Sequence, residues 1–475
     1  MKKLLLYISI ITVLTGTGSC KKFLETLPDN RTVITNPTQV TQLLTTAYPH
    51  ATYMLFCEAL SDNVEDKGNS GTGIDPQTFL VNTQSFKYQD PQDISADSPI
   101  AYWDSCYAAI AVANQALTYC NGPDSANYSA QKGEALLCRA YAHFMLVTLY
   151  AKAYDPATAG SDPGVPYMTA VNKSVFGKFD RSTVAAAYAH IESDLLTGLP
   201  LLQDKVYGDA PKFHFTLQAA HAFAARFYLF KRDFAKVVEH STAVFGSANP
   251  AGLIRNQVKF YAMSYDDMTV YYNNSSNPAN ILLQEAPGSK YPNNYYSYRY
   301  GIGSQLNAAL FFSQNVTGGS YAMNVYGAGP QYFNFPKFRR DVNIMSLFSM
   351  DEVLLNRAEA NIRLKNYDAA IADLNTWVGN NVSNYDPARH NVTADKMTNF
   401  YGATLDISML LTTLDFKRAT YMQEGLRWLD ILRLNIPVTH TGSPNFSTTL
   451  VAGDKRRLLQ LPPEAVNDGM TLNPR

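Results

Sequence analysis

Apolar residues recur at helical spacing through most of the chain. Within 129–150, Ala140, Phe144 and Val147 fall at positions i, i+4 and i+7, which places them on one face of a helix. Similar spacing predicts further helices over 98–117, 181–196, 216–230 and 405–434. The pattern of apolar and polar positions therefore predicts a mainly α-helical protein.

Two segments share the arrangement of a helical hairpin, in which the second helix opens with an aromatic residue directly after a turn. In the first hairpin, Asp233 is the expected N-cap and Phe234 opens the second helix. In the other, Ser349 and Glu352 are spaced as a capping box, and Tyr367 opens the partner helix. Tetratricopeptide hairpins have this pattern, but the copies here do not follow one another at the usual period of about 34 residues. We therefore expect isolated tetratricopeptide-like hairpins within a larger α-rich body.

Two long stretches lack helical periodicity. One covers 67–99, and the other covers 250–336, which is rich in Gly, Pro and Asn and holds most of the clustered tyrosines. Segments of this length without periodicity are usually functional or disordered, and the aromatic content argues against disorder. We expect large irregular loops with a functional role, followed at the end of the chain by a loop-like tail from Pro437.

The N-terminus has the pattern of an export signal. Two lysines precede a short apolar run over 4–14, and small residues then lead to Cys20. The run is too short to span a bilayer, so we predict a cleaved signal peptide over 1–19. A cysteine at this place is typical of a bacterial lipoprotein, and we predict lipidation of Cys20. Thr17 stands where leucine is usual, so free secretion is the alternative.

Charge and cysteine content narrow the class further. The formal net charge is −1, from 39 basic and 40 acidic residues, and no long block of like charge suggests nucleic-acid binding. No second run of 18 apolar residues appears, so the body is expected to be soluble. The remaining cysteines, without metal-binding spacing, are expected to be buried free thiols, with a Cys106–Cys120 disulfide as the alternative. They are Cys57, Cys106, Cys120 and Cys138.

Motifs for catalysis are not found. The sequence contains no HExxH, no GxSxG and no P-loop. His214 and His221 are expected to be packed or exposed rather than bound to metal, and the acidic stretch 62–66 lacks the ligand order of an EF-hand. We predict no catalytic residues, no cofactor and no metal.

Several phrases of the sequence, taken in order, resemble the SusD/RagB family of outer-membrane lipoproteins from the bacterial phylum of Bacteroides. They lie at 20–25, 133–150, 164–167, 181–195, 352–375, 424–433, 461–464 and 473–474. Each phrase is short, but their order covers nearly the whole chain. Ser349, near the place where many members have Arg, and Pro463, in the final phrase, depart from the family pattern.

This resemblance implies an extracellular scaffold of tetratricopeptide-like hairpins whose loops form the ligand face. It implies a single domain over 20–475, with an N-terminal half at 20–245, an irregular tyrosine-rich region at 246–335 and a C-terminal half at 336–475. Such a protein sits on a SusC-like TonB-dependent transporter in the outer membrane and captures nutrients, most often glycans, without catalysis. A peptide ligand is the alternative, and a secreted glycosidase is a third hypothesis.

Sugar binding requires aromatic rings for the C–H faces of the sugar and polar groups for its hydroxyls. The tyrosine-rich segment supplies both kinds of group. Its candidate ligand-binding residues are Asn294, Tyr295, Tyr296, Tyr298, Arg299 and Tyr300, and the alternative is a strand with alternate tyrosines packed inward. The earlier irregular stretch supplies second-rank candidates, namely Phe79, Phe86 and Tyr88.

Other aromatic and charged residues are expected to have structural roles. Core packing is favoured for Trp103, Trp377 and Trp428, because all three lie in or beside helical patterns. The charged positions Arg427, Asp430 and Arg433 are expected either to form a surface ion network or to brace a loop. Arg139 and Glu359 are expected to form structural pairs.

Overall fold

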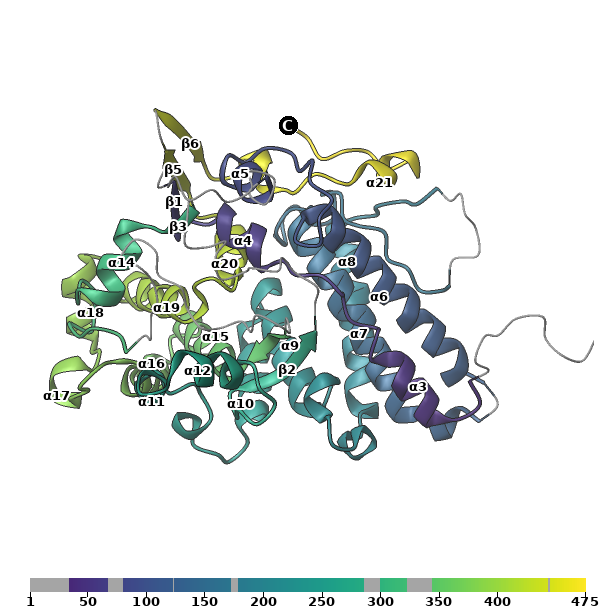
Figure 1. Ribbon diagram of the computed structural model, residues 1–475, viewed down its shortest axis with the longest axis horizontal. Helices are drawn as coiled ribbons and strands as arrows, with labels where there is room; N and C mark the ends of the chain where they lie inside the picture. The colour runs from purple at the N-terminus through teal and green to yellow at the C-terminus, as the bar shows by residue number, and fades with distance from the viewer. Residues whose placement is uncertain are drawn as a thin grey trace, which may run out of the picture.

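The computed structural model describes residues 34–66, 80–122, 124–171, 178–285, 300–322, 344–442 and 445–475. These residues form a mainly helical protein with three separate two-stranded antiparallel sheets. Figure 1 shows α3, α6, α7 and α8 on one side of the molecule and α16 to α19 on the other. No helix among the described residues is both long enough and apolar enough to cross a bilayer.

The N-terminal part of the fold is a group of long helices around one buried helix. Its helices are α3 (Pro37–Leu44), α4 (Met54–Leu60), α5 (Leu80–Phe86), α6 (Pro99–Cys120), α7 (Ser129–Tyr150), α8 (Val184–Gly198), α9 (Leu217–Lys231) and α10 (Phe234–Phe245). Nearly every residue of α7 is buried, and α7 packs against both α6 and α8. A helix that is covered on all sides forms the centre of its layer rather than a surface.

The backbones of α7 and α8 touch where two glycines meet. A Cβ added to Gly133 would lie 2.8 Å from the carbonyl oxygen of Gly198, and a Cβ added to Gly198 would lie 2.9 Å from that of Gly133. Any side chain at either position would push the two helices apart. The N-terminal helices therefore have a fixed spacing at this crossing.

The two predicted hairpins are present and pack against each other through α10 and α15. In the first, Asp233 Oδ1 accepts a hydrogen bond from the backbone N–H of Lys236 at 3.3 Å, which confirms the predicted N-cap. In the second, Ser349 Oγ accepts from the N–H of Glu352 at 3.3 Å. The Glu352 carboxylate does not complete the predicted capping box, because it binds Arg226 at 2.6 Å instead.

The C-terminal part contains α15 (Met350–Arg363), α16 (Tyr367–Asn381), α17 (Pro387–His390), α18 (Ala394–Tyr401), α19 (Leu405–Tyr421), α20 (Leu426–Leu434) and α21 (Pro463–Asn467). The helices predicted over 405–434 are α19 and α20, and the chain breaks between them, where Gln423 and Gly425 have φ values of 67° and 73°. A Cβ at Gly425 would lie 2.8 Å from the Met54 backbone. The break therefore lets α20 lie directly against α4.

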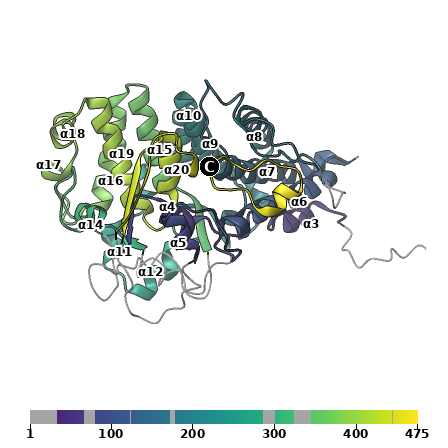
Figure 2. The same ribbon diagram turned by 90° about the horizontal axis from the view of Figure 1, so that it is seen from above.

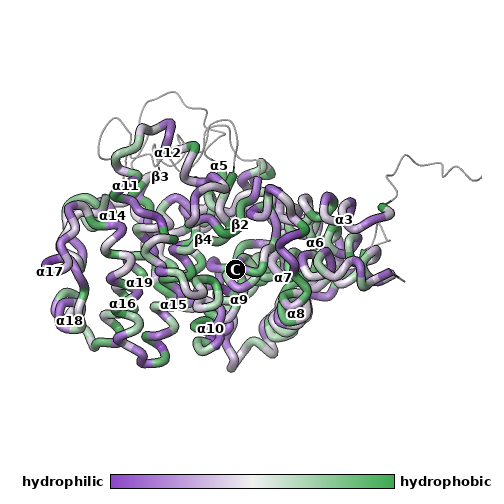
Figure 3. The backbone as a smooth tube through the Cα atoms, turned by 90° about the horizontal axis from the view of Figure 1, so that it is seen from below, coloured by the Kyte–Doolittle hydropathy of each residue, from purple (hydrophilic) through white to green (hydrophobic). Residues whose placement is uncertain are grey.

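The middle of the chain is less irregular than the sequence predicts. It contains α11 (Gln257–Tyr261), α12 (Tyr265–Tyr272) and α14 (Ser304–Phe311). It also supplies strands to two sheets, in which β1 (Val64–Asp66) pairs with β3 (Tyr300–Ile302), and β2 (Asn280–Glu285) pairs with β4 (Ile344–Ser349). Figure 3 shows α5, α12 and β3 along the same side of the molecule.

The predicted loop-like tail is wrong over part of its length. Residues after Pro437 form a hairpin of β5 (Val438–Gly442) and β6 (Phe446–Leu450), and α21 follows. The end of the chain is also tied to α7. Leu459 donates its backbone N–H to Leu149 at 3.1 Å, and Asn473 Nδ2 donates to the carbonyl oxygen of Tyr150 at 2.9 Å.

The three tryptophans and the four described cysteines are buried, as predicted. The cysteines are free thiols, so the alternative Cys106–Cys120 disulfide is not formed. Burial raises the pKa of the Cys57, Cys106 and Cys138 thiols well above its usual value, which keeps them protonated and unreactive.

A buried group of charges joins α15, α19 and α20. Arg433 donates two hydrogen bonds of 2.6 Å to the Glu359 carboxylate, and Lys417 Nζ donates a third at 2.9 Å. Arg433 also binds Asp430 at 2.6 Å. These cations hold the pKa of Glu359 well below its usual range, although burial acts in the opposite direction. The structural role expected for Glu359 is confirmed, and the surface network expected around Arg433 is wrong because the group is buried.

Candidate functional site

A column of aromatic rings lies where α5, α20, β3 and β5 meet. The rings of Phe86 and His440 are parallel, with centroids 4.2 Å apart, and His440 stacks in turn on Tyr88 at 4.9 Å. Tyr88 continues the column to Trp428 at 6.3 Å. At the other end, Phe86 contacts Tyr300 at 4.7 Å. We call these five residues the aromatic column.

The elements that supply the column are far apart in the sequence. Phe86 is the last residue of α5, Tyr300 is the first residue of β3, and Trp428 lies in α20. Tyr88 has a φ of 52°, which is unusual for a tyrosine and brings its ring alongside His440. The column therefore fixes the relative positions of segments that the chain order keeps separate.

Hydrogen bonds hold the central ring of the column. His440 Nδ1 lies 2.7 Å from the carbonyl oxygen of Phe86, and Nε2 lies 2.8 Å from that of Ser61. Burial lowers the pKa of His440, while these two carbonyls act to raise it. The hydroxyl of Tyr88 donates to the carbonyl oxygen of Leu60 at 3.0 Å, so the column is attached to the end of α4.

The strand β3 is held in the same way. Tyr300 donates its hydroxyl to Thr83 Oγ1 at 3.1 Å, and Tyr300 pairs with Asp66 in the register of the β1–β3 sheet. The Glu65 carboxylate accepts two hydrogen bonds from Ser304, one from its backbone N–H at 2.8 Å and one from its hydroxyl at 2.7 Å. These bonds fix the start of α14 next to β3.

The structure places three of the predicted ligand-binding residues inside the column. Phe86, Tyr88 and Tyr300 are 0%, 6% and 1% exposed, and their rings contact other rings rather than solvent. The other candidates lie outside the described residues, and so does Cys20; they are Phe79, Asn294, Tyr295, Tyr296, Tyr298 and Arg299. The assignment of all these residues to ligand binding stays a prediction.

Chain connectivity relates the two groups. Residue 79 immediately precedes α5, and residue 299 immediately precedes Tyr300. Since Phe86 and Tyr300 are in contact, the two stretches that the sequence nominates independently are attached to the same aromatic column.

Sequence reasoning did not find His440 and did not predict the strand that carries it. In the structure β5 alternates buried and exposed residues, with Val438 and His440 buried, but its sequence shows only one apolar residue, Val438. Such alternation over a short run is typical of a half-buried strand. The predicted loop-like tail hid this contribution to the site.

Charged residues around the column are engaged in structural contacts. Asp62 accepts two hydrogen bonds of 2.8 Å from Arg427, which lower the pKa of the Asp62 carboxyl well below its usual range despite burial. This pair confirms that Arg427 braces a loop. No group of three His, Cys, Asp or Glu side chains within the described part of the chain is placed to hold a metal ion. The predicted packing of His214 is confirmed, since its Nδ1 lies 2.7 Å from Glu134.

One family model matches part of the sequence, and solved structures match the fold. Residues 22–229 match the SusD-like_3 family model, described as "Starch-binding associating with outer membrane". The fold match extends further along the chain. A SusD superfamily protein from Bacteroides fragilis aligns with 92% of this chain and with 99% of its own length. The sequence identity is 19% and the TM-score is 0.70. The chain therefore resembles SusD-like proteins, in sequence over 22–229 and in fold over most of its length. The predicted family resemblance and the mainly α-helical fold are confirmed.

Other solved structures agree with the SusD-like fold. A protein from Bacteroides vulgatus described as a putative sugar-binding protein is 18% identical, with a TM-score of 0.70 over 93% of this chain and 99% of its own. A laminarin-binding SusD-like protein is 16% identical, with a TM-score of 0.63 over 93% of this chain and 100% of its own. At these identities the likeness concerns the fold. No curated protein sequence matches the chain.

Proposed function

We propose that this SusD-like protein is a cell-surface lipoprotein that captures a nutrient glycan and passes it to a TonB-dependent transporter in the outer membrane. The family description, which names starch binding and association with the outer membrane, supports this proposal. The descriptions of two structural neighbours as sugar-binding and laminarin-binding also support it. The export signal that ends in Cys20 supports attachment to a membrane from outside the cytoplasm.

The observation that carries the proposal is the attachment of both aromatic-rich stretches to the aromatic column. A sugar is bound well by rings held at fixed spacing, because less conformational freedom is then lost when the ligand arrives. In our proposal, Tyr295, Tyr296 and Tyr298 stack on sugar faces while Asn294 and Arg299 bind hydroxyls. Phe79 contributes from the other stretch. The buried rings of Phe86, Tyr88 and Tyr300 act as support for these contacts.

We propose binding without catalysis. Two of the carboxylates near the column, Asp62 and Glu65, accept hydrogen bonds from Arg427 and Ser304 respectively. A glycosidase needs a pair of carboxyl groups that flank the scissile bond, one of them free to donate a proton. The commitment of these two groups to structural contacts supports a binding role.

Replacing Tyr295, Tyr296 and Tyr298 together by Ala is expected to weaken glycan binding by roughly tenfold or more. An aromatic contact contributes about 0.5–1.5 kcal/mol beyond area burial, and 1.4 kcal/mol corresponds to tenfold in affinity. Calorimetry against a panel of laminarin and starch oligosaccharides measures the change. The helical circular dichroism signal should be unchanged.

The matched control for this triple variant is Tyr385→Ala, which removes a tyrosine that is 36% exposed in the loop before α17. It should bind the glycan as the wild type does. Unchanged affinity in a folded triple variant would remove the segment from the site. If the wild-type protein binds a peptide pool and no glycan, its ligand is a peptide. If the purified protein releases shorter sugars from a glycan, it is a glycosidase.

Replacing Cys20 by Ala is expected to move the protein from the membrane fraction to the soluble fraction of cells. Several acyl chains on one residue hold a protein firmly on a membrane, and the variant has no residue to carry them. Cell fractionation followed by immunoblotting measures this. Cys120→Ala, which changes a cysteine in α6, should stay with the membrane. Retention of the Cys20→Ala protein there would contradict the lipid anchor.

A further inference from the structure

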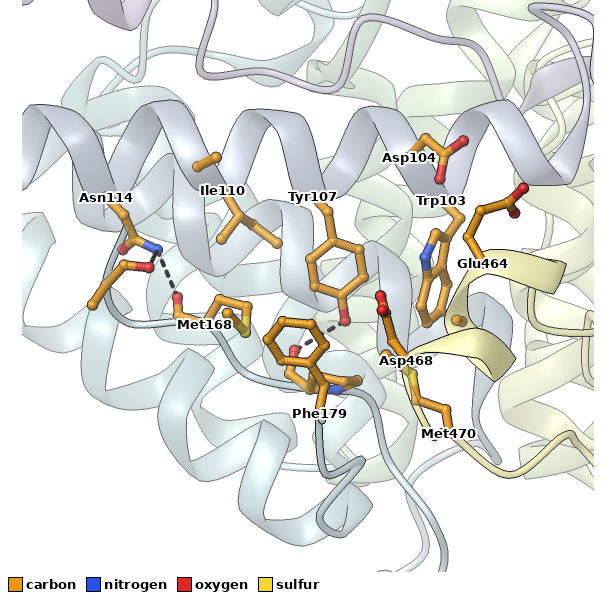
Figure 4. Close-up of a pocket in the computed structure, with 14 residues that line it drawn as sticks. Trp103, Asp104, Tyr107, Ile110, Asn114, Met168, Phe179, Glu464, Asp468 and Met470 are labelled. Carbon is orange, nitrogen blue, oxygen red and sulfur yellow. Dashed lines mark hydrogen bonds between the residues drawn. The ribbon is translucent and has the colours of Figure 1, made fainter. Parts of the chain in front are cut away.

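A cavity of about 300 Å³ opens between α6, the segment 166–170 and α21, as Figure 4 shows. In Figure 2 the short helix α21 lies beside α6, although the two are far apart in the sequence. No residue of the aromatic column lines this cavity. Its volume is in the range that binds small organic ligands.

The walls of the cavity are mainly aromatic and apolar. Tyr107 and Phe179 supply rings, and Met168 and Met470 supply flexible apolar surface. The Tyr107 hydroxyl donates to the carbonyl oxygen of Pro166 at 3.0 Å, which fixes the ring and leaves the hydroxyl proton engaged. Such walls suit the apolar face of a small ring.

One donor that faces the cavity has no acceptor among the described residues. Trp103 is only 5% exposed, its ring packs against Tyr107 at 5.0 Å and against Tyr150 at 4.8 Å, and no described residue accepts a hydrogen bond from its Nε1. Figure 4 shows this nitrogen on the side of the indole that faces the middle of the cavity. The indole N–H is therefore available to donate a hydrogen bond to a ligand oxygen inside the cavity.

Among the described residues, the charged side chains that line the cavity are all acidic. Asp104, Glu464 and Asp468 line it, and the described lining residues include no Lys, Arg or His. Burial, and then repulsion from Glu464, raises the pKa of the Asp104 carboxyl, so these two carboxylates lie close enough to disfavour each other. A cation between Asp104 and Glu464 would relieve the repulsion.

We propose that this cavity is a second ligand site of the protein and that it binds an amino sugar, either free or at the end of a glycan. The ammonium group lies between Asp104 and Glu464, and a C–H face of the sugar packs on the rings of Tyr107 and Phe179. A sugar oxygen accepts the hydrogen bond of Trp103 Nε1. The positive charge is argued from the cavity itself, whereas the choice of a sugar as its carrier rests on the proposed function.

Titration of the full chain with glucosamine, monitored by saturation-transfer NMR, tests the site. Glucose and N-acetylglucosamine are titrated in the same way as uncharged comparison sugars. Glucosamine should bind at least about fivefold more tightly than either, because ion pairs at exposed carboxylates contribute up to about 1 kcal/mol each. Glu464→Gln should remove most of this preference. Trp103→Phe keeps a ring in the core but removes the N–H. It should weaken the binding of all three sugars while the melting temperature of the protein stays within a few degrees of the wild type.

The matched control is Asp124→Asn, which removes an exposed carboxylate in the turn after α6. It should bind glucosamine as the wild type does. Equal binding of glucosamine and glucose, or an equal effect of Glu464→Gln and Asp124→Asn, would overturn the site. If lysine methyl ester binds as tightly as glucosamine, the sugar is not needed for recognition, and the cavity is a general amine site. A wild-type protein that binds glycans but not glucosamine would contradict this inference and leave the proposed function untouched.

Discussion

Glu359→Gln is expected to lower the free energy of unfolding by about 3–5 kcal/mol, which is typical when one partner of a buried ion pair is removed. Glu359 is 0% exposed and accepts hydrogen bonds from both Arg433 and Lys417. Glutamine keeps the shape of the side chain but removes its charge. Two buried cations then share the remaining carboxylate of Asp430, which lies 2.6 Å from Arg433 and 3.8 Å from Lys417.

Urea denaturation of the full chain measures this loss, and two variants complete the design. Glu239→Gln makes the same chemical change on the exposed surface of α10, and it should alter stability by less than about 0.5 kcal/mol. Adding Lys417→Met to Glu359→Gln removes one of the two cations, so it should restore part of the lost stability. A Glu359→Gln protein as stable as the Glu239→Gln protein would show that the buried charges contribute little.

Acidification is expected to destabilise the protein through His143, in the middle of α7. His143 Nδ1 donates to the carbonyl oxygen of Arg139 at 2.8 Å, and Nε2 accepts the backbone N–H of Met168 at 3.0 Å. Both nitrogens of the neutral ring are therefore satisfied. A proton added to Nε2 would face the N–H of Met168, and burial is the main cause that lowers the pKa of His143 from 6.5 to about 3.

The sign of the effect follows from which state binds the proton. Between pH 6.5 and about 3, an unfolded chain is protonated at this histidine and the folded protein is not. The contribution of neutral His143 to the free energy of unfolding is thus fully present above pH 6.5. It decreases as the pH falls, by about 3 kcal/mol between pH 7 and pH 4. Burial also lowers the pKa of His240 to about 4, so the total loss should be larger.

Urea denaturation at pH 7, 5 and 4 checks this prediction. His143→Gln should be less stable at pH 7 but should lose about 3 kcal/mol less than the wild type on going to pH 4. His50→Gln, which changes an exposed histidine ahead of α4, should keep the wild-type dependence on pH. A His143→Gln protein with the same dependence as the wild type would contradict a role for this residue.

Much of the helical framework could be predicted from local pattern, because the determinants of a helix lie within a few residues. The predicted helix over 129–150 has the observed bounds of α7, and the N-cap at Asp233 is present. The capping box at Ser349 was only half right. Its Glu352 carboxylate binds Arg226, a residue of another helix, and no local pattern reveals such a partner.

The site could be predicted only as a composition, since its geometry depends on contacts between distant segments. Phe86 and Tyr300 were chosen because aromatic residues suit sugar binding, but the structure places both in a buried contact. The ring that joins them to Tyr88 and Trp428 comes from His440, in a strand that the sequence did not predict. Long-range stacking of this kind has no signature in a single sequence.

The ties between α7 and the end of the chain have a consequence for biogenesis. The carbonyl oxygens of Leu149 and Tyr150, in the last turn of α7, are satisfied by Leu459 and Asn473. A ribosome delivers those two partners more than three hundred residues later, so the central helix cannot complete its hydrogen bonds while synthesis is under way. This end of α7 is therefore completed only when the final residues have been synthesised, and under the proposed export such a delay would keep the chain from closing around α7 before it is translocated.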